Sequence, residues 1–150
     1  MLQFFIQIIL KRFKRNPIAP TNELQIGNQG EDLAAKYLKK EKAYKLLARN
    51  WKYKQDEIDI IAQDGEVLVF IEVKTSAIEG LMPTYYRVTK KKKKNLERVC
   101  KAYLKTAKPR PKHFRFDIVT VKLCQNKENN VNHYTNVRLF SKNFHLLSNE

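Results

Sequence analysis

Two apolar segments joined by Asp64-Gly65 constrain the fold more than any other feature of the sequence. Residues 57–63 and 66–74 are rich in Ile and Val, and an Asp-Gly pair between such runs is a strong hairpin signal. Both segments are apolar on their two faces, which is typical of strands inside a sheet. The sequence therefore predicts a central hairpin with helices covering the sheet.

The remaining segments predict the elements around this hairpin. Helices are expected at residues 27–42 and 90–106, where apolar residues recur at helical spacing. Further strands are expected at 44–53, 114–121 and 131–137. The predicted order is a helix, three strands, a second helix and two strands, which indicates the α/β class with a mixed sheet flanked by helices.

The chain is predicted to be one domain at residues 26–150, preceded by an extension at 1–25. From Met1 to Arg15 an apolar stripe is followed by basic residues, the reverse of the order in a secretory signal. One interpretation is an amphipathic helix on an anionic membrane surface. The interpretation that we favour is a loosely held end, or a helix packed on the domain or on a second copy in a homodimer. The two prolines between residues 16 and 20 predict a linker.

The net charge is the unusual feature of the composition. The chain has 30 Lys and Arg against 15 Asp and Glu, which gives a charge of +15 at pH 7. So large a positive charge attracts polyanions, nucleic acid first. The two cysteines are too few for a disulfide framework, and no apolar run is long enough for a transmembrane helix. The chain is therefore expected to be cytoplasmic.

Acidic side chains gather at one end of the predicted hairpin. If Asp64-Gly65 is the two-residue loop, Glu57 faces Glu72 and Asp59 faces Phe70. The side chains that then share one face are Glu57, Asp59, Glu72 and Lys74. Carboxylates at this spacing need a counter-charge, which Lys74 or a divalent cation such as Mg²⁺ or Mn²⁺ supplies. The alternative is an exposed ladder of salt bridges, or a bulge that reverses the faces.

The spacing of Asp59 and Glu72-Val73-Lys74 resembles the catalytic signature of the PD-(D/E)XK, or restriction-endonuclease-like, superfamily. More widely, residues 26–140 resemble the YraN-like family of bacterial proteins, which is related to nucleases of the Holliday-junction-resolvase type. The motifs that carry this resemblance are GNQGEDLA at 27–34, LARNW at 47–51, EIDII at 57–61, VFIEVKT at 69–75, VT at 88–89 and RFDIV at 115–119.

This resemblance implies a restriction-endonuclease-like αβββαβ core and a metal-dependent endonuclease that hydrolyses phosphodiester bonds. Branched or structured DNA is favoured over RNA as its substrate, although the sequence by itself does not decide between the two. The resemblance also implies that Asp59, Glu72 and the backbone carbonyl of Val73 bind Mg²⁺ or Mn²⁺. Lys74 would orient or deprotonate the attacking water. The alternative function is a nucleic-acid-binding module that keeps the fold without significant catalysis.

Two further acids and two departures bear on this site. The resemblance implies that Glu31 completes the metal site, although the dipole of the first helix also explains a carboxylate there. Glu57 is a candidate accessory ligand. Gln55-Asp56 stand where family members usually have Gly-Gly, which changes the loop beside the site. Lys90-Lys91-Lys92 stand where Pro-Arg-Lys is usual, which only adds charge.

A dense basic segment lies between Arg87 and Arg115, where 13 residues are Lys or Arg and only Glu97 is acidic. Lysines at a helix start oppose the helix dipole by about 0.3–1 kcal/mol each, so another interaction must favour them. Lys92 and Lys93 continue the apolar stripe and are expected to face the acids, where a phosphate backbone would pass. The alternative is a solvated face that keeps the protein soluble. The expected nucleic-acid-binding residues are Lys90, Lys91, Lys92, Lys93, Lys94, Arg110 and Lys112, extended by Arg115, with Tyr85, Tyr86 and His113 as stacking groups.

Three other residues are more easily explained as structural. Cys100 lies on the apolar stripe of its helix and is expected to be buried. Trp51 is expected to pack in the core. His133 matches a family position but has no neighbours at metal-binding spacing.

Overall fold

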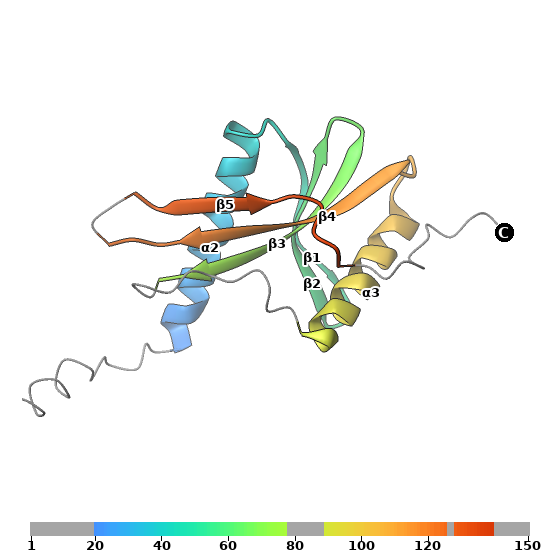
Figure 1. Ribbon diagram of the computed structural model, residues 1–150. Coiled ribbons are helices and arrows are strands. Elements are labelled where there is room, and N and C mark those ends of the chain that lie inside the picture. Colours follow the sequence, from blue (N-terminus) through green and yellow to red (C-terminus); the bar gives the residue numbers. More distant parts are fainter. Residues whose placement is uncertain (1–19, 78–88, 126–127, 140–150) are drawn as a thin grey trace, which may run out of the picture.

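The computed structural model describes residues 20–77, 89–125 and 128–139 (Figure 1). Its elements are α2 (Pro20–Lys40), β1 (Lys45–Tyr53), β2 (Asp56–Asp64), β3 (Val67–Ser76), α3 (Lys90–Thr106), β4 (His113–Lys122) and β5 (Asn130–Tyr134). This order confirms the predicted succession of helices and strands. The predictions for residues 1–15 and for Tyr85 and Tyr86 lie outside the described residues.

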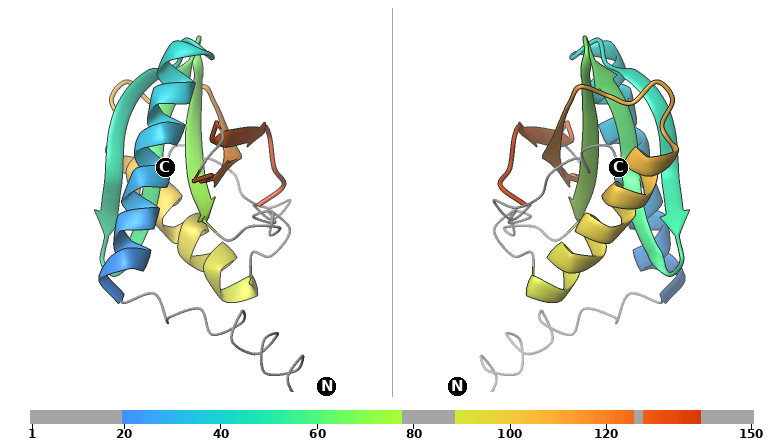
Figure 2. Two further views of the ribbon diagram at one scale, coloured as in Figure 1. Left: turned by 90° about the vertical axis from the view of Figure 1, so that its left-hand side faces the viewer. Right: turned by 90° about the vertical axis from the view of Figure 1, so that its right-hand side faces the viewer.

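The strands form one mixed sheet in the order β1-β2-β3-β4-β5. All neighbours are antiparallel except β3 and β4, whose connection carries α3. Helix α3 packs mainly on β2 and β1, and α2 packs mainly on β3 and β4 from the other face (Figure 2). This is a mixed α/β architecture consistent with a restriction-endonuclease-like αβββαβ core.

The sheet separates two hydrophobic cores. One lies under α3 and includes Phe70 and Leu96, and the other lies under α2 and includes Ile71 and Leu38. The middle strands are therefore buried on both faces, as their apolar sequences predict. Cys100 is fully buried, as expected. No helix in the described part of the chain is long and apolar enough to cross a membrane.

Helix α2 begins at Pro20, seven residues before the predicted start. Proline breaks a helix interior but suits its first position, where its missing N–H has no intrahelical partner. The predicted linker is therefore wrong at Pro20. Glu31 lies in the middle of α2 rather than near its start, so the helix dipole does not account for it.

The hairpin register differs from the predicted one. Asp64 pairs with Val67 and Ile60 pairs with Ile71, so the loop is Gly65-Glu66 rather than Asp64-Gly65. Gly65 has a φ of 57° and stands first in the loop, where a type II′ turn places glycine. The shift keeps each side chain on its predicted face but changes its partner. Continued by one residue, the observed register sets Asp59 opposite Glu72.

Candidate functional site

Asp59 of β2 and Glu72 of β3 come together where the two central strands stop pairing. Regular pairing ends at Ile60 and Ile71, and beyond it the backbone N–H of Val73 donates to Asp59 Oδ2 at 2.6 Å. The Asp59 side chain thus satisfies a backbone donor that β2 leaves unpaired. This bond fixes the carboxylate at the diverging end of the hairpin.

The two carboxylates share a largely buried site. Burial raises the pKa of Asp59 to about 8, and the negative charge of Glu72 adds to the increase, whereas the hydrogen bond from Val73 opposes it. Glu72 is itself buried, and its Oε2 has no hydrogen-bond partner. Two neighbouring carboxylates in a low-dielectric environment cannot both ionise easily without a cation. The orphaned oxygen and the raised pKa therefore suit a hard cation.

Lys92 reaches this pair from the first turn of α3. Its Nζ lies 3.0 Å from Glu72 Oε1. Burial lowers the pKa of Lys92, but the charge of Glu72 and the hydrogen bond to it outweigh burial, so the net pKa is raised. Thr89 caps the helix, its hydroxyl accepting from the backbone N–H of Lys92 at 3.2 Å. This cap sets the helical phase that turns Lys92 toward the sheet.

Lys93, also expected to face the acids, is exposed to solvent. That expectation is wrong because the buried stripe of α3 is narrow. It consists of Leu96, Val99, Cys100 and Leu104, and only Lys92 continues it by a full turn from Leu96. At the margin of such a stripe a lysine ammonium group stays in water.

Glu31 of α2 joins the site through Asn50, a residue that the sequence analysis missed. With its amide oriented to satisfy both neighbours, Asn50 donates to Glu31 Oε2 at 2.9 Å and to the backbone carbonyl of Asp59 at 3.3 Å. Arg49 lies 3.8 Å from Glu31 Oε2. Burial raises the pKa of Glu31, and the Asn50 hydrogen bond opposes it. Asn50 has a φ of 51°, a conformation that asparagine tolerates. Its place in the LARNW motif at residues 47–51 was the sequence signal that could have found it.

Lys74 lies on the same face of the sheet as Glu72, whereas Glu57 does not lie opposite Glu72. Lys74 follows Glu72 by two residues on β3, so it points to the same face, and it is half-buried. Glu57 instead pairs across to β1, with its Oε2 3.3 Å from Lys52 Nζ. The expectation that Glu57 faces Glu72 is wrong because the register is shifted.

The described residues do not assemble a complete metal cage from side chains. Within residues 20–77, 89–125 and 128–139, no three His, Cys, Asp or Glu side chains form a group that can hold a metal ion. The candidate site is therefore the pair Asp59 and Glu72, with Lys92 as its present counter-charge and Glu31 beyond Asn50.

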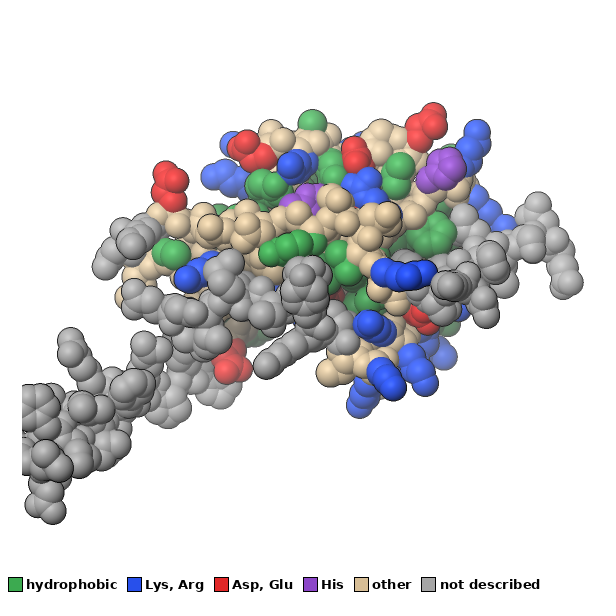
Figure 3. Space-filling model, in the orientation of Figure 1, with side chains coloured by type: hydrophobic (Ala, Val, Ile, Leu, Met, Phe, Trp, Pro, Cys, Tyr) green, Lys and Arg blue, Asp and Glu red, His purple; other side chains and the backbone are tan. Residues whose placement is uncertain are grey.

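Basic side chains gather over α3 (Figure 3). At its start, the exposed lysines are Lys90, Lys91, Lys93 and Lys94. Arg110 and Lys112 are also exposed, but they follow the other end of a 17-residue helix. At 1.5 Å per residue the two groups are separated by about 25 Å. The predicted track is therefore two clusters joined by the length of α3.

Arg115 does not belong to this surface, which corrects the prediction. Its side chain is 17% exposed, and its guanidinium donates to Asp117 Oδ1 at 3.0 Å and to Asp64 Oδ2 at 2.9 Å. His133, whose role the sequence left open, lies 2.9 Å from Asp117 Oδ2. Alternation along β4 carries Arg115 and Asp117 to the face on which His133 of β5 lies.

The expectation that Trp51 packs in the core is confirmed in part. It is half-buried, and its ring meets Tyr103 of α3 edge to face, with centroids 5.2 Å apart. Its neighbour on the same side of β1, Tyr53, remains exposed.

Comparison of this chain with known protein sequences shows the family to which it belongs. The family described as Uncharacterised protein family UPF0102 matches residues 30–121, a segment that holds Asp59, Glu72 and Lys92. A UPF0102 protein of Carboxydothermus hydrogenoformans is 39% identical over 118 residues, covering 77% of this chain and 97% of that protein. A UPF0102 protein of Chlorobium limicola is 42% identical over 97 residues, covering 64% of this chain and 74% of that protein. These matches confirm the expected YraN-like relationship, and the chain belongs to the UPF0102 family.

Proposed function

We propose that this protein is a metal-dependent endonuclease of the PD-(D/E)XK type that hydrolyses phosphodiester bonds, with branched or structured DNA as its substrate. The observation that carries the proposal is the Asp59–Glu72 pair at the diverging end of the central hairpin. Its buried, unpartnered Glu72 Oε2 and the raised pKa of Asp59 fit a ligand set for a hard cation.

In this proposal each residue of the site has a separate role in the reaction. Asp59, Glu72 and the backbone carbonyl of Val73 would hold Mg²⁺ or Mn²⁺, which polarises a phosphate and lowers the pKa of a bound water. Lys74, on the same face as Glu72, would orient or deprotonate that water. Lys92 would leave Glu72 for a phosphate oxygen, because a bound divalent cation supplies the counter-charge that Lys92 now gives.

Glu31 and Asn50 have a positioning role in this proposal. The Asn50 amide joins the Glu31 carboxylate to the backbone carbonyl of Asp59, so it holds the end of β2 against α2. A ligand carboxylate must be held to within a fraction of an ångström of its productive position. The exposed lysines at the start of α3 and the net charge of +15 would bring the polyanionic substrate to this end of the sheet.

Asp59→Asn tests the proposal most directly. The change keeps the side-chain shape and an acceptor for the Val73 N–H but removes a ligand charge. Cleavage of duplex, single-stranded and branched DNA and of RNA should be measured with Mg²⁺ or Mn²⁺ for both proteins. We expect the wild type to cleave and Asp59→Asn to lose about 10²-fold or more of that activity. Lys74→Ala should lower cleavage while leaving metal affinity largely intact.

Asp32→Asn is the matched control. Asp32 is a solvent-exposed acid beside Glu31 on α2, and its carboxylate pairs with Arg49 at 2.7 Å. This variant should cleave like the wild type. Equal residual cleavage by Asp59→Asn and the wild type would assign the activity to a contaminant or to another site.

A second candidate is a nucleic-acid-binding module with little or no catalysis. The contact that favours it is the Lys92–Glu72 ion pair, because it already neutralises one of the two carboxylates. In this case no substrate would be cut, yet binding would weaken linearly on a log–log salt plot. Lys93→Glu, at an exposed position, should then reduce the salt slope by about 1 or more.

A further inference from the structure

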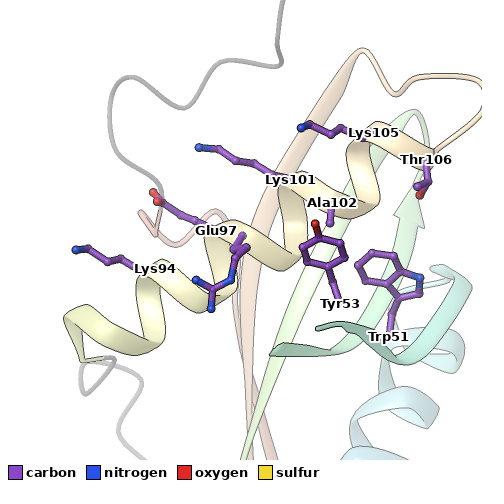
Figure 4. A pocket seen from close by; sticks show the side chains of 9 residues that line it. Trp51, Tyr53, Lys94, Glu97, Lys101, Ala102, Lys105 and Thr106 are labelled. Carbon is purple, nitrogen blue, oxygen red and sulfur yellow. The ribbon is translucent and has the colours of Figure 1, made fainter. Parts of the chain in front are cut away.

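A groove runs between α3 and the edge strand β1 (Figure 4). It has a volume of about 590 Å³. Its lining includes Trp51 and Tyr53 from β1 and Lys94, Lys101 and Lys105 from α3, and in this view the lysine side chains extend away from the two rings. None of these residues takes part in the acid pair described above, so the groove needs its own explanation.

Two aromatic rings make up the β1 side of the groove. Trp51 is held by its edge-to-face contact with Tyr103, at an interplanar angle of 90°. Tyr53 is 39% exposed, one of the few large apolar side chains in the described residues left in water. Lys54 Nζ already lies 5.6 Å from the centre of its ring. The groove therefore offers an oriented aromatic surface that attracts cations and flat π-systems.

The α3 side of the groove is a row of cations. Lys94, Arg98, Lys101 and Lys105 follow one another at intervals of three or four residues, which places them along one side of the helix. At 1.5 Å per residue the row is about 16 Å long. Arg98 is held in place because its Nε donates to the buried Asp56 at 2.5 Å. Glu97 is the one acid among the residues that line the groove.

We propose that this groove binds an unpaired, single-stranded segment of nucleic acid, with a base stacked on Tyr53 and the phosphates along the α3 cations. Aromatic faces beside a positive groove are the recurring way in which proteins hold single strands. Bases inside a duplex are stacked on one another and cannot reach the Tyr53 ring. The shape and charge thus favour a strand over a duplex.

The groove and the candidate site are both lined by residues from the first turns of α3. Helix α3 supplies Lys92 to the acid pair and, two residues later, Lys94 to the groove. Residues two apart project to different sides of a helix, so a single strand that leaves the groove at Lys94 must pass around the start of α3 to reach the candidate site. This inference rests on the proposed function and deepens it, because it assigns the substrate class as nucleic acid that carries an unpaired segment next to the bond to be cut.

Trp51 provides a direct readout, since it is the only tryptophan of the chain. The wild type in EDTA should be titrated with a single-stranded oligonucleotide and with the duplex of the same sequence, each as DNA and as RNA. We expect single strands to change the Trp51 fluorescence and to bind more tightly than the duplex at equal salt. Comparison of the DNA titrations with the RNA titrations shows whether the groove prefers deoxyribose or ribose nucleic acid.

Tyr53→Ala is the decisive variant. It should weaken single-strand binding by about tenfold, the loss expected for one stacked base, and leave duplex binding unchanged. Tyr53→Phe keeps the ring and should bind like the wild type. Leu47→Ala is the matched control, because Leu47 lies on the same strand and is 40% exposed but does not line the groove.

Different outcomes would overturn the groove assignment and the endonuclease proposal. Metal-dependent cleavage by a Tyr53→Ala variant that binds single strands like the wild type would overturn the groove assignment alone. Single-strand binding that depends on Tyr53, without cleavage of any substrate, would support the groove and overturn the endonuclease. Equal affinities for single strand and duplex, with no change in Trp51 fluorescence, would also overturn the groove assignment.

Discussion

At the scale of single residues, Asp59 is held where its own charge is unfavourable. Its carboxylate is anchored by the Val73 N–H beside Glu72, and its pKa is raised by burial and by that neighbour. A group whose pKa is raised on folding stabilises the fold fully below its ordinary pKa, and this contribution is lost as the pH rises through the raised value. In the metal-free protein, ionised Asp59 therefore lowers stability.

Asp59→Asn should consequently stabilise the metal-free protein while removing activity. We expect the free energy of unfolding at pH 9 to rise by about 0.5–2 kcal/mol, because the variant has no charge to desolvate. Urea denaturation in EDTA at pH 6 and pH 9 measures this. The advantage should shrink at pH 6, where Asp59 is protonated in the folded protein. A variant no more stable than the wild type at pH 9 would contradict the charge argument, and Asp32→Asn, at an exposed site, should change nothing.

At the scale of elements, helix α2 approaches the sheet so closely that only glycine fits at one position. A Cβ on Gly30 would lie 1.8 Å from Thr75 Oγ1 on β3, whereas a Cβ on Gly27 would meet nothing within 4 Å. The next residue on the helix is Glu31, so this close approach also sets how near Glu31 comes to Asn50 and β2. The packing of one glycine thus contributes to the geometry of the candidate site.

Gly30→Ala and Gly27→Ala form a matched pair on one helix. Gly30→Ala should lower the free energy of unfolding by about 1–3 kcal/mol, because α2 must move off β3. Gly27→Ala should raise it by about 0.5–1 kcal/mol, since alanine is the better helix former. Thr75→Ala removes the two nearest atoms and should recover part of the loss in Gly30→Ala. Similar effects of the two glycine substitutions in thermal or urea unfolding would show that the contact is not tight.

At the scale of the whole molecule, the buried Asp117 joins segments far apart in the chain. It accepts from Arg115 of β4, lies 2.9 Å from His133 Nε2 of β5, and accepts the Asn136 N–H at 2.8 Å. Arg115 in turn reaches Asp64 at the end of β2. Burial raises the pKa of Asp117, but these hydrogen bonds outweigh it, so the pKa lies below its ordinary value.

A depressed pKa makes this network a determinant of acid stability. Its contribution is present above the ordinary pKa of an aspartate and is lost as the pH falls through the lowered value. The wild type should therefore lose stability below about pH 4. Asp117→Asn should cost about 3–5 kcal/mol at pH 7, because it leaves buried partners unpaired, and should flatten the pH dependence below pH 4. Denaturation at pH 7 and pH 3 checks this, and a cost under about 1 kcal/mol would show the network to be dispensable.

The order of elements and the faces of the central strands were predictable from the sequence. Lys90–Thr106 was predicted at its observed bounds because its apolar residues repeat every three or four positions. Asp59, Glu72 and Lys74 were placed on one face because alternation along a strand survives a register shift of this kind. The start of α2 was predicted late, because proline is read as a breaker although it suits the first turn.

Other features of the site depend on which distant segments of the chain come into contact. The hydrophobic periodicity of a single segment does not predict such contacts. Asp59 and Val73 are 14 residues apart, and Arg115 and Asp64 are 51 residues apart. The turn at Gly65 decided that Asp59, rather than Glu57, faces Glu72. Packing of α3 on the sheet turned Lys92 toward the acids and left Lys93 in water, and it formed the groove over Tyr53. Periodicity along the chain determines which face a side chain occupies, because it follows from backbone geometry alone, whereas its partner is decided only when sheet and helices pack together.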